Sequence, residues 1–304
     1  MPHRIIRIIP QGRMANQMFQ LMMAESLRSS IRDAEITGYS LPQWNLAGGA
    51  PLAENALSVS IRSHVAPIEQ IIAFANSVDY VDIRVASASL RYAYYRSMLA
   101  HFRALFRYAG KYPDRPGPDD LVISIRLGDI LSGRHANYMP LPLSWYEDLI
   151  ARTGLSPVFV GEIGKDFYSE ALRRRFPKAR FVANEDPMID FDFLRKSIHV
   201  VPSIGTFSWL ASWLSETTRT IYFPVAGLFN QLGRPDVDLL PVDDDRYRFF
   251  ESGMQSWSAT PAQVDHILNC EHDFRAIGSG DLKTLFAPHI GTSGMKVRTH
   301  PLWD

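Results

Sequence analysis

The sequence is poor in cysteine and has no excess of charge of either sign. Cys270 is the only cysteine among 304 residues, which excludes an intrachain disulfide and a cysteine-based metal site. The 32 Lys and Arg residues balance 32 Asp and Glu residues, whereas nucleic-acid-binding domains usually carry a basic excess. The cysteine usage fits a reducing compartment, and the charge balance gives no indication of a nucleic acid as a partner.

Long apolar runs are also missing. The run Ile5–Ile9 is interrupted by Arg7 and is too short for the apolar region of a signal peptide. No stretch reaches the roughly 18 apolar residues that a membrane-spanning helix needs. Internal repeats and low-complexity segments are absent as well. We therefore expect a soluble, cytoplasmic protein, and leave open its peripheral association with the inner face of a membrane.

The most informative stretch is Leu121–Asp129. It begins as an apolar, β-branched run typical of a buried strand and ends in Arg126-Leu127-Gly128-Asp129. An arginine at the end of a buried strand is costly unless an anion meets it, and its planar fork suits a phosphate or a carboxylate. The stretch alone leaves a plain Arg126–Asp129 ion pair at a turn equally open.

A regular alternation of strands and helices follows a Pro- and Asp-rich linker at 112–120. We expect an N-terminal domain over 1–120, a nucleotide-binding domain over 121–240, and a C-terminal helical segment over 241–304 that packs back on the first domain. The expected strands of the second domain are Leu121–Ile125, Val158–Gly161, Ala179–Val182, Ile198–Pro202 and Thr220–Phe223. The expected helices between them are Ser144–Thr153, Lys165–Phe176, Asp190–Lys196 and Ser208–Leu214.

This alternation predicts an α/β fold with a parallel, doubly wound sheet. Ligands of such sheets bind beyond the carboxyl ends of the strands, where Arg126 and the loop after Pro202 both lie. That loop, Ser203–Ser208, offers hydroxyls ahead of a helix, and these can cap the helix or bind phosphate. Trp209 and Trp213 are expected on the buried face of that helix.

The rest of the chain gives simpler expectations. A strand, a glycine turn at Gly12 and a helix open the chain, but the turn lacks the glycine pattern of a dinucleotide-binding fingerprint. Residues 39–60 are expected to be irregular, and Asp243–Asp245 to form a solvated turn. The remaining elements that we expect are strands at Arg4–Ile9 and Glu35–Gly38, and helices from the turn to Leu27, at Pro67–Ala75, at Arg91–Tyr108 and at Pro261–Cys270.

Three stretches, in this order and spacing, resemble the bacterial α-1,2-fucosyltransferase family, and more distantly the nodulation α-1,6-fucosyltransferases and the protein O-fucosyltransferases. Gly12–Gln20 is similar to the family's Gly-x-x-Gly-Asn-Gln-Met-Phe-Gln. Ser124–Asp129 is similar to its His-x-Arg-x-Gly-Asp. Asp192–Leu194 and Ser203–Trp209 resemble its Asp-apolar segment and its Ser-x-Phe-Ser-Trp-Trp. Together the stretches span roughly the first 215 residues of the chain.

The resemblance implies a GT-B architecture, in which two Rossmann-like domains face a cleft. It also implies a GDP-fucose donor, a glycan acceptor, inversion at the anomeric carbon and no metal cofactor. In this family Arg126 would grip the β-phosphate and Asn16 would lie at the cleft. The other positions that would bind substrate are Gly12, Arg13, Ser124, Gly128, Asp192, Ser203, Thr206, Phe207 and Ser208.

The chain departs from the family pattern at several positions. Ser124 replaces the histidine, Leu127 stands where many members carry a second arginine, Ala15 replaces a glycine, and Leu210 replaces the second tryptophan. Since Arg126 is retained, phosphate binding is expected, while the donor sugar and the linkage stay open. Asp129, and otherwise Glu25, is the carboxylate expected to act as the base on the acceptor hydroxyl.

Two other functions are compatible with the sequence. In a metal-dependent glycosyltransferase of the GT-A type, Asp190-Phe191-Asp192 would be the Asp-x-Asp motif that holds a divalent cation against the diphosphate. The position of this motif at the start of an expected helix argues against that role, because the helix dipole also favours carboxylates there. A degenerate family member would bind a sugar nucleotide or a glycan without transferring it, as the loss of the histidine suggests.

Overall fold

The structure is a computed structural model that describes residues 3–49, 53, 55–108, 110, 115–286 and 297–299. Contacts divide the chain into two compact units. The first unit is Met1–Arg107, Asp236–Leu239 and His289–Asp304, and the second is Tyr108–Pro235 and Leu240–Pro288. Part of the predicted linker (residues 112–114) and part of the predicted C-terminal segment lie outside the described residues.

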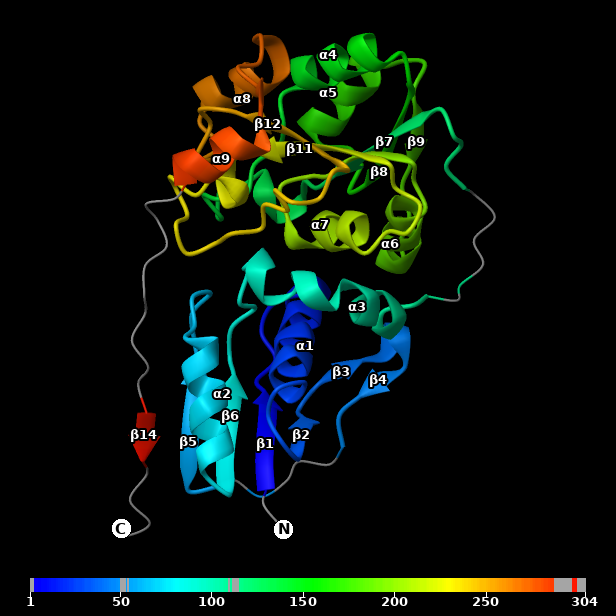
Figure 1. Ribbon diagram of the computed structural model, residues 1–304. Coiled ribbons are helices and arrows are strands. Elements are labelled where there is room, and N and C mark those ends of the chain that lie inside the picture. Colours follow the sequence, from blue (N-terminus) through cyan, green and yellow to red (C-terminus); the bar gives the residue numbers. More distant parts are fainter. Residues whose placement is uncertain are drawn as a thin grey trace. The chain divides into compact units, whose positions relative to one another are not determined.

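The first unit contains a sheet that is parallel except for one edge strand, β14 (Figure 1). Its strands in spatial order are β14 (Val297–Thr299), β5 (Leu57–Ile61), β6 (Tyr80–Val85), β1 (His3–Ile8) and β2 (Ala34–Thr37). Its helices are α1 (Met14–Arg28), α2 (Ile68–Ser77) and α3 (Leu99–Leu105), and a small ribbon joins β3 (Ser40–Leu41) to β4 (Leu46–Ala47). The strand–turn–helix opening predicted for the chain is confirmed as β1 and α1.

A buried ion pair joins the adjacent strands β1 and β6 of this sheet. Arg7 of β1 donates from Nε and Nη2 to Oδ2 of Asp82 on β6, at 3.2 Å in each case. The Asp82 side chain is completely buried, and its other oxygen accepts a hydrogen bond of 3.0 Å from the amide of Asn55. Both charges are therefore neutralised inside the sheet, where an unpaired charge would be costly.

Three expectations for this unit were wrong. Part of the stretch 39–60 forms strand β5 rather than irregular structure, and Arg91–Tyr108 is not one helix. Two short 3₁₀ turns, Tyr92–Tyr94 and Arg96–Met98, precede α3. Tyr95, between the two turns, is buried and donates a hydrogen bond of 2.7 Å from its hydroxyl to the carbonyl of Ser89. The third wrong expectation was that residues 121–240 all belong to the second domain, because Asp236–Leu239 belong to the first unit.

The segment Asp236–Leu239 returns to the first unit because its backbone pairs there. The N–H of Tyr92 donates to the carbonyl of Asp238 at 2.6 Å, and the N–H of Asp238 donates to the carbonyl of Leu90 at 2.9 Å. The side chains of Arg91 and Asp238 add an ion pair at 3.8 Å. These contacts are tertiary, so no local pattern in the sequence marks them.

The second unit has a doubly wound sheet, as the alternation predicted, so the α/β class is confirmed. Its strands in spatial order are β13 (Arg275–Ile277), β12 (Tyr247–Glu251), β11 (Thr220–Val225), β10 (His199–Val201), β7 (Asp120–Ile125), β8 (Ser156–Gly161) and β9 (Arg180–Val182). All are parallel except β13. The parallel strands follow the Rossmann order 3-2-1-4-5-6, and the order reverses between β7 and β10.

Helices cover both faces of this sheet. In Figure 1, α4 (Leu143–Thr153), α5 (Phe167–Arg175) and α8 (Pro261–Asn269) lie on one face, and α6 (Pro187–Arg195) and α7 (Thr206–Trp213) lie on the other. Helix α9 (Ser279–Phe286) follows β13. Strands β12 and β13 extend the second sheet, so this part of 241–304 does not form the helical segment expected on the first domain, whereas β14 pairs with β5 in the first sheet.

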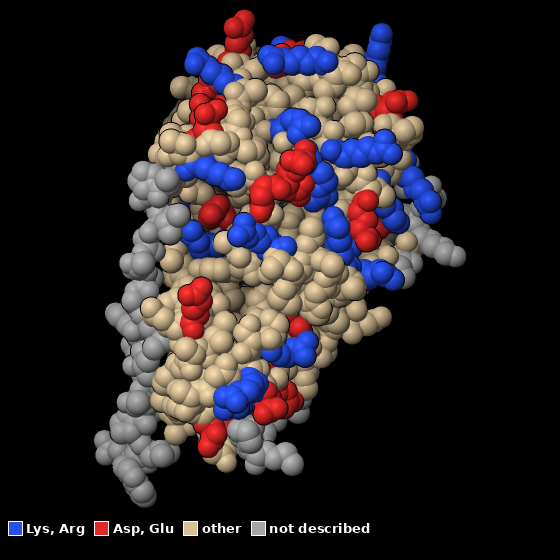
Figure 2. Space-filling model, viewed as in Figure 1, with Lys and Arg blue, Asp and Glu red and all other residues tan. Residues whose placement is uncertain are grey.

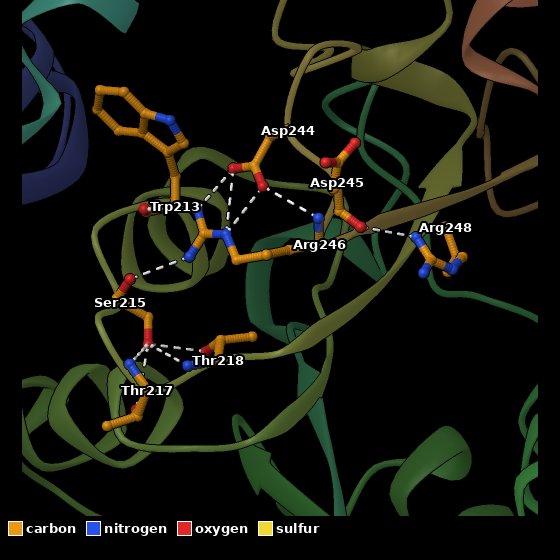
Figure 3. Close-up of polar contacts among 8 residues, drawn as sticks. All are labelled: Trp213, Ser215, Thr217, Thr218, Asp244, Asp245, Arg246 and Arg248. Carbon is orange, nitrogen blue, oxygen red and sulfur yellow. Dashed lines mark hydrogen bonds and ion pairs between the residues drawn. The ribbon is translucent and has the colours of Figure 1, made fainter.

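Arg246 anchors the carboxyl end of α7 (Figure 3). Its guanidinium donates to the carbonyls of Trp213 at 3.1 Å and Ser215 at 2.9 Å, and it pairs with the carboxylate of Asp244 at 2.7 Å. A cation at this end of a helix is favoured by the helix dipole. The prediction that Asp243–Asp245 is simply solvated is thus wrong for Asp244, whose side chain is 15% exposed.

Charge is mixed on the molecular surface that Figure 2 shows. Lys and Arg side chains are interspersed with Asp and Glu side chains on that face, and none of it is a stripe of one sign. This agrees with the balanced composition. Among the described residues, no helix combines the length and apolar character that crossing a membrane requires.

Candidate functional site

Arg126 lies immediately after β7, beside the point where the strand order reverses. In a doubly wound sheet, this reversal opens a crevice that binds ligands at the carboxyl ends of the strands. The Arg126 side chain is 21% exposed, and its Nη2 lies 3.4 Å from Oδ1 of Asp129, a long contact for an ion pair. Its Nε is buried and has no hydrogen-bond acceptor among the described residues. A guanidinium with so few acceptors is a ready binding group for an anion.

The Arg126 guanidinium packs against two neighbours. Its Cζ lies 5.1 Å from the centre of the Tyr138 ring, within the range of a cation–π contact. The backbone of Gly205 lies close enough that an added Cβ would be 3.5 Å from Nη1. The guanidinium is therefore positioned by packing while most of its hydrogen-bonding capacity remains for a ligand.

A chain of buried hydroxyls links the carboxyl ends of β7 and β10. Oγ of Ser124 lies 3.3 Å from Oγ of Ser203, which lies 3.0 Å from Oγ of Ser208. Ser208 can donate to the carbonyl of Ser203 at 3.1 Å, and it is completely buried. Direct contact between Ser208 and a ligand is thus blocked in this conformation, and its hydroxyl instead stabilises the loop that precedes α7.

The other two residues predicted in this loop have different surroundings. Thr206 begins α7 and is 4% exposed. Phe207 packs its ring edge-on against Phe191 of α6, with 5.3 Å between ring centres. Gly205, Thr206 and Phe207 form the start of α7, where backbone N–H groups and the helix dipole favour an anion.

The segment after Arg126 carries two residues that sequence reasoning missed, His135 and Tyr138. Nε2 of His135 lies 3.6 Å from Oδ2 of Asp129, and the His135 ring meets the Tyr138 ring edge-on with 6.2 Å between centres. Burial raises the pKa of the Tyr138 hydroxyl, while the charges of Arg126 and Arg234 lower it in part. Neither residue lies in a periodic segment, so no local pattern pointed to it.

Glu162 follows β8 and shapes the same loop. Its Oε2 accepts a hydrogen bond of 2.9 Å from the N–H of Leu127, and a Cβ at Gly128 would lie 2.9 Å from this oxygen. Gly128 also has a φ of +31°, which L side chains rarely adopt. The positive φ favours glycine at position 128, and a larger residue there would also displace the carboxylate of Glu162. The position of Glu162 directly after a predicted strand was the signal that could have identified it.

Asp190 and Asp192, the Asp-x-Asp pair, do not converge. Asp190 accepts a hydrogen bond of 2.7 Å from Asn184, whereas Asp192 pairs with Lys196 one turn along α6. Positions two apart on a helix point in different directions, so each carboxylate has its own partner. In the part of the chain that the structure describes, no group of three or more His, Cys, Asp and Glu residues could hold a metal ion.

Ionisation of the buried Asp190 is expected to lower the free energy of unfolding as the pH rises. Burial raises its pKa from 3.8 to about 6, the Asn184 hydrogen bond opposes the shift, and Asp186 and Glu162 add to it. Between about pH 4 and pH 6 the folded state then binds more protons than the unfolded state, so ionisation above this window costs stability. At pH 7 to 8, Asp190→Asn is expected to raise the free energy of unfolding by about 1–3 kcal/mol.

The measurement is urea unfolding of wild type and Asp190→Asn at several pH values. The advantage of the variant should be near zero at pH 4 and should grow up to about pH 6, the pKa that burial gives Asp190. Asp245→Asn, at an exposed position, is the matched control and should show no such trend. An advantage of Asp190→Asn that does not change with pH would show that ionisation of Asp190 is not its cause.

The predicted residues of the first unit lie at the carboxyl end of β1. Gly12 has a φ of +69°, Arg13 is the N-cap of α1, and Asn16 lies in the first turn of α1. A Cβ at Gly12 would approach Nδ2 of Asn16 to 2.5 Å. These three residues are therefore neighbours within the first unit, whereas Arg126 belongs to the second unit.

Gln20 stabilises the turn between β1 and α1 by hydrogen bonds. Its buried side-chain amide donates to the carbonyls of Ile9 at 2.7 Å and Val85 at 3.1 Å, and its oxygen accepts from the N–H of Gln11 at 2.9 Å. Gln20 thus joins the carboxyl ends of β1 and β6. Glu25, the second carboxylate considered as a base, pairs with Arg28 at 2.6 Å and His101 at 3.2 Å.

Comparison with known proteins gives structural similarity only. No protein-family model and no curated protein matches the chain. The iron-containing dodecameric glycosyltransferase TibC from enterotoxigenic E. coli is similar in structure at 12% identity and a TM-score of 0.42, over 94% of this chain and 76% of TibC. The E. coli heptosyltransferase WaaC with ADP is similar at 10% identity and a TM-score of 0.43, over 94% and 99%. Neither name denotes a fucosyltransferase.

Proposed function

We propose that this chain is a glycosyltransferase whose second unit binds the diphosphate of a nucleotide-sugar donor. The observation that carries the proposal is the state of Arg126. Its guanidinium lies at the strand-order reversal of a Rossmann-type sheet, held by packing, with a buried Nε that has no acceptor among the described residues. An anion is the ligand that such a group lacks, and the diphosphate of a nucleotide is the anion that this type of sheet commonly binds.

The chemistry of glycosyl transfer makes use of such a group. When the bond between the sugar and the phosphate breaks, negative charge develops on the leaving diphosphate while the sugar ring becomes positively charged. A preorganised guanidinium, together with the backbone N–H groups at the start of α7, stabilises that developing charge. A metal ion supplies the same stabilisation in other enzymes, and we propose that it is not needed here.

Within this proposal, the donor is GDP-fucose and the acceptor is a hydroxyl of a glycan or glycoconjugate. The resemblance of Gly12–Gln20, Ser124–Asp129 and Ser203–Trp209 to fucosyltransferase motifs supports that choice. Asp129 is the proposed base on the acceptor hydroxyl. The divergent partners of Asp190 and Asp192 do not favour a metal-dependent Asp-x-Asp mechanism.

The test is a thermal-shift comparison of GDP-fucose, GDP-mannose, UDP-glucose and a dTDP-sugar, each with and without EDTA. Ligand at 100 times its dissociation constant should add about 2.7 kcal/mol of stability. We expect stabilisation by GDP-fucose that EDTA does not change, followed by release of GDP on incubation. Stabilisation by another donor instead of GDP-fucose would identify that donor as the substrate. Binding without turnover would indicate a non-catalytic protein. No stabilisation by any donor would refute the proposal.

A further inference from the structure

One carboxylate, that of Asp129, contacts both Arg126 and His135. Its Oδ1 lies 3.4 Å from Nη2 of Arg126, and its Oδ2 lies 3.6 Å from Nε2 of His135. The ring of Tyr138 contacts the other two side chains, with 5.1 Å to Cζ of Arg126 and 6.2 Å to the ring centre of His135. The four side chains form a closed ring of contacts within the segment that follows β7.

A diphosphate at Arg126 would change the electrostatics of this ring. The carboxylate of Asp129 would face an anion on the same guanidinium, and like charges repel most strongly at such short distances. The repulsion is relieved if Asp129 turns from Arg126 towards a positive charge. His135 is the neighbour that can provide one, because histidine is the side chain that changes charge between pH 5 and 8.

The other charged groups near this ring of contacts are arginines. Arg134 precedes it in the chain and is exposed, and Arg126 lies beyond Asp129. Arg234 acts on the hydroxyl of Tyr138, the aromatic neighbour of His135. A bound anion would bring a negative charge into this group of cations. The His135 side chain is 55% exposed, so a proton can reach it from solvent.

We propose that His135 is a further residue of the donor site and takes up a proton from solvent when a diphosphate binds Arg126, as Asp129 shifts from Arg126 to the imidazolium. The inference rests on the proposed function. The only bond formed is an N–H bond on the imidazole, and the conjugate base of the buffer remains in solution.

Proton uptake by His135 would stabilise the released nucleoside diphosphate more than the intact nucleotide-sugar donor. The diphosphate of a nucleotide sugar is esterified at both ends and carries about two negative charges, whereas a released nucleoside diphosphate carries nearly three near neutral pH. The imidazolium therefore interacts more strongly as the bond to the sugar breaks. Interactions that strengthen in this way accelerate the chemical step rather than only tightening binding.

The experiment is isothermal titration calorimetry with inorganic pyrophosphate and with GDP, at pH 7, in buffers of different ionisation enthalpy. The proteins are wild type, His135→Gln, Asp129→Asn, and His266→Gln as a matched control on α8. Pyrophosphate and GDP can themselves gain or lose protons when they bind. The measured quantity is therefore the difference in proton uptake between wild type and a variant that bind the same ligand. Wild type is expected to take up roughly 0.2–0.5 proton more than His135→Gln.

The control and the pH dependence make the result specific. His266→Gln should match wild type, and Asp129→Asn should bind the anion more tightly while losing the extra uptake. At pH 6, His135→Gln should bind pyrophosphate about 3- to 5-fold more weakly than wild type, as suits an exposed charge pair, and the two should converge at pH 8.5.

The possible failures are distinct. If neither GDP nor pyrophosphate binds, or if binding does not depend on Arg126, the proposed donor site and the inference both fall. If binding depends on Arg126 but wild type and His135→Gln take up equal numbers of protons, the proposed function stands and the role of His135 is refuted.

Discussion

Arg126→Ala is expected to lower the affinity for a nucleoside diphosphate by at least roughly 100-fold, because charge-assisted hydrogen bonds are worth about 1.5–3 kcal/mol each and a guanidinium can make two. The transfer rate should fall by about 100- to 1,000-fold, the usual effect of removing one donor that stabilises developing charge. Binding calorimetry and single-turnover transfer are the measurements. Arg126 is well suited to this role since its Nε lacks an acceptor and its contact with Asp129 is 3.4 Å long.

Two further variants separate charge from geometry. Arg126→Lys keeps the charge but not the planar fork or its packing against Tyr138, so it should recover only part of the affinity. Arg134→Ala removes an exposed arginine from the same loop and is the matched control, expected within about twofold of wild type. If Arg126→Ala folds and binds nucleotide as wild type does, the diphosphate site must be elsewhere.

Asp82→Ala is expected to lower the free energy of unfolding by about 3–5 kcal/mol, because it leaves the guanidinium of Arg7 buried without its carboxylate. The pair is joined by two contacts of 3.2 Å, and the side chain of Arg7 is only 11% exposed. The amide of Asn55 would lose its acceptor as well. Urea unfolding followed by circular dichroism measures the change.

The matched control for this change is Asp79→Ala. The Asp79 side chain is 79% exposed and lies 4.0 Å from Arg4, so its removal should cost less than about 1 kcal/mol. The double variant Arg7→Met with Asp82→Leu should be much more stable than Asp82→Ala, since it removes both charges and leaves none unpaired. A small loss for Asp82→Ala alone would mean that Arg7 finds another acceptor or water.

Strand β6 shows which part of the fold the sequence alone did not reveal. In β6, Val81, Ile83 and Val85 alternate with Asp82 and Arg84, whose charges locally favour a surface position. Asp82 is nevertheless buried, because Arg7 neutralises it from the neighbouring strand. The sequence of β6 thus carries the alternation of a strand with one exposed face, and only the tertiary structure reveals that Asp82 is buried as well.

The serines illustrate a different limit. Ser203 and Ser208 were predicted to lie by the diphosphate because hydroxyls ahead of a helix can bind phosphate. Sequence spacing cannot distinguish a hydroxyl that faces a ligand from one that faces another hydroxyl. In the structure Ser208 is completely buried and hydrogen-bonded to Ser203, so its contribution to the site is to stabilise the loop.

The sequence by itself determined the α/β class, the alternating elements of the second sheet, and the placement of Arg126 and the Ser203–Ser208 loop after strands. Those features follow from local periodicity and from glycines and charges at strand ends, which act within a few residues. Only the tertiary structure decided that β7 and β10 are neighbours at the reversal of strand order, and that Asp129, His135 and Tyr138 close a ring of contacts with Arg126. Strand order and loop conformation depend on long-range packing and on the pairing of charges far apart in the sequence. Local sequence patterns do not predict these long-range interactions.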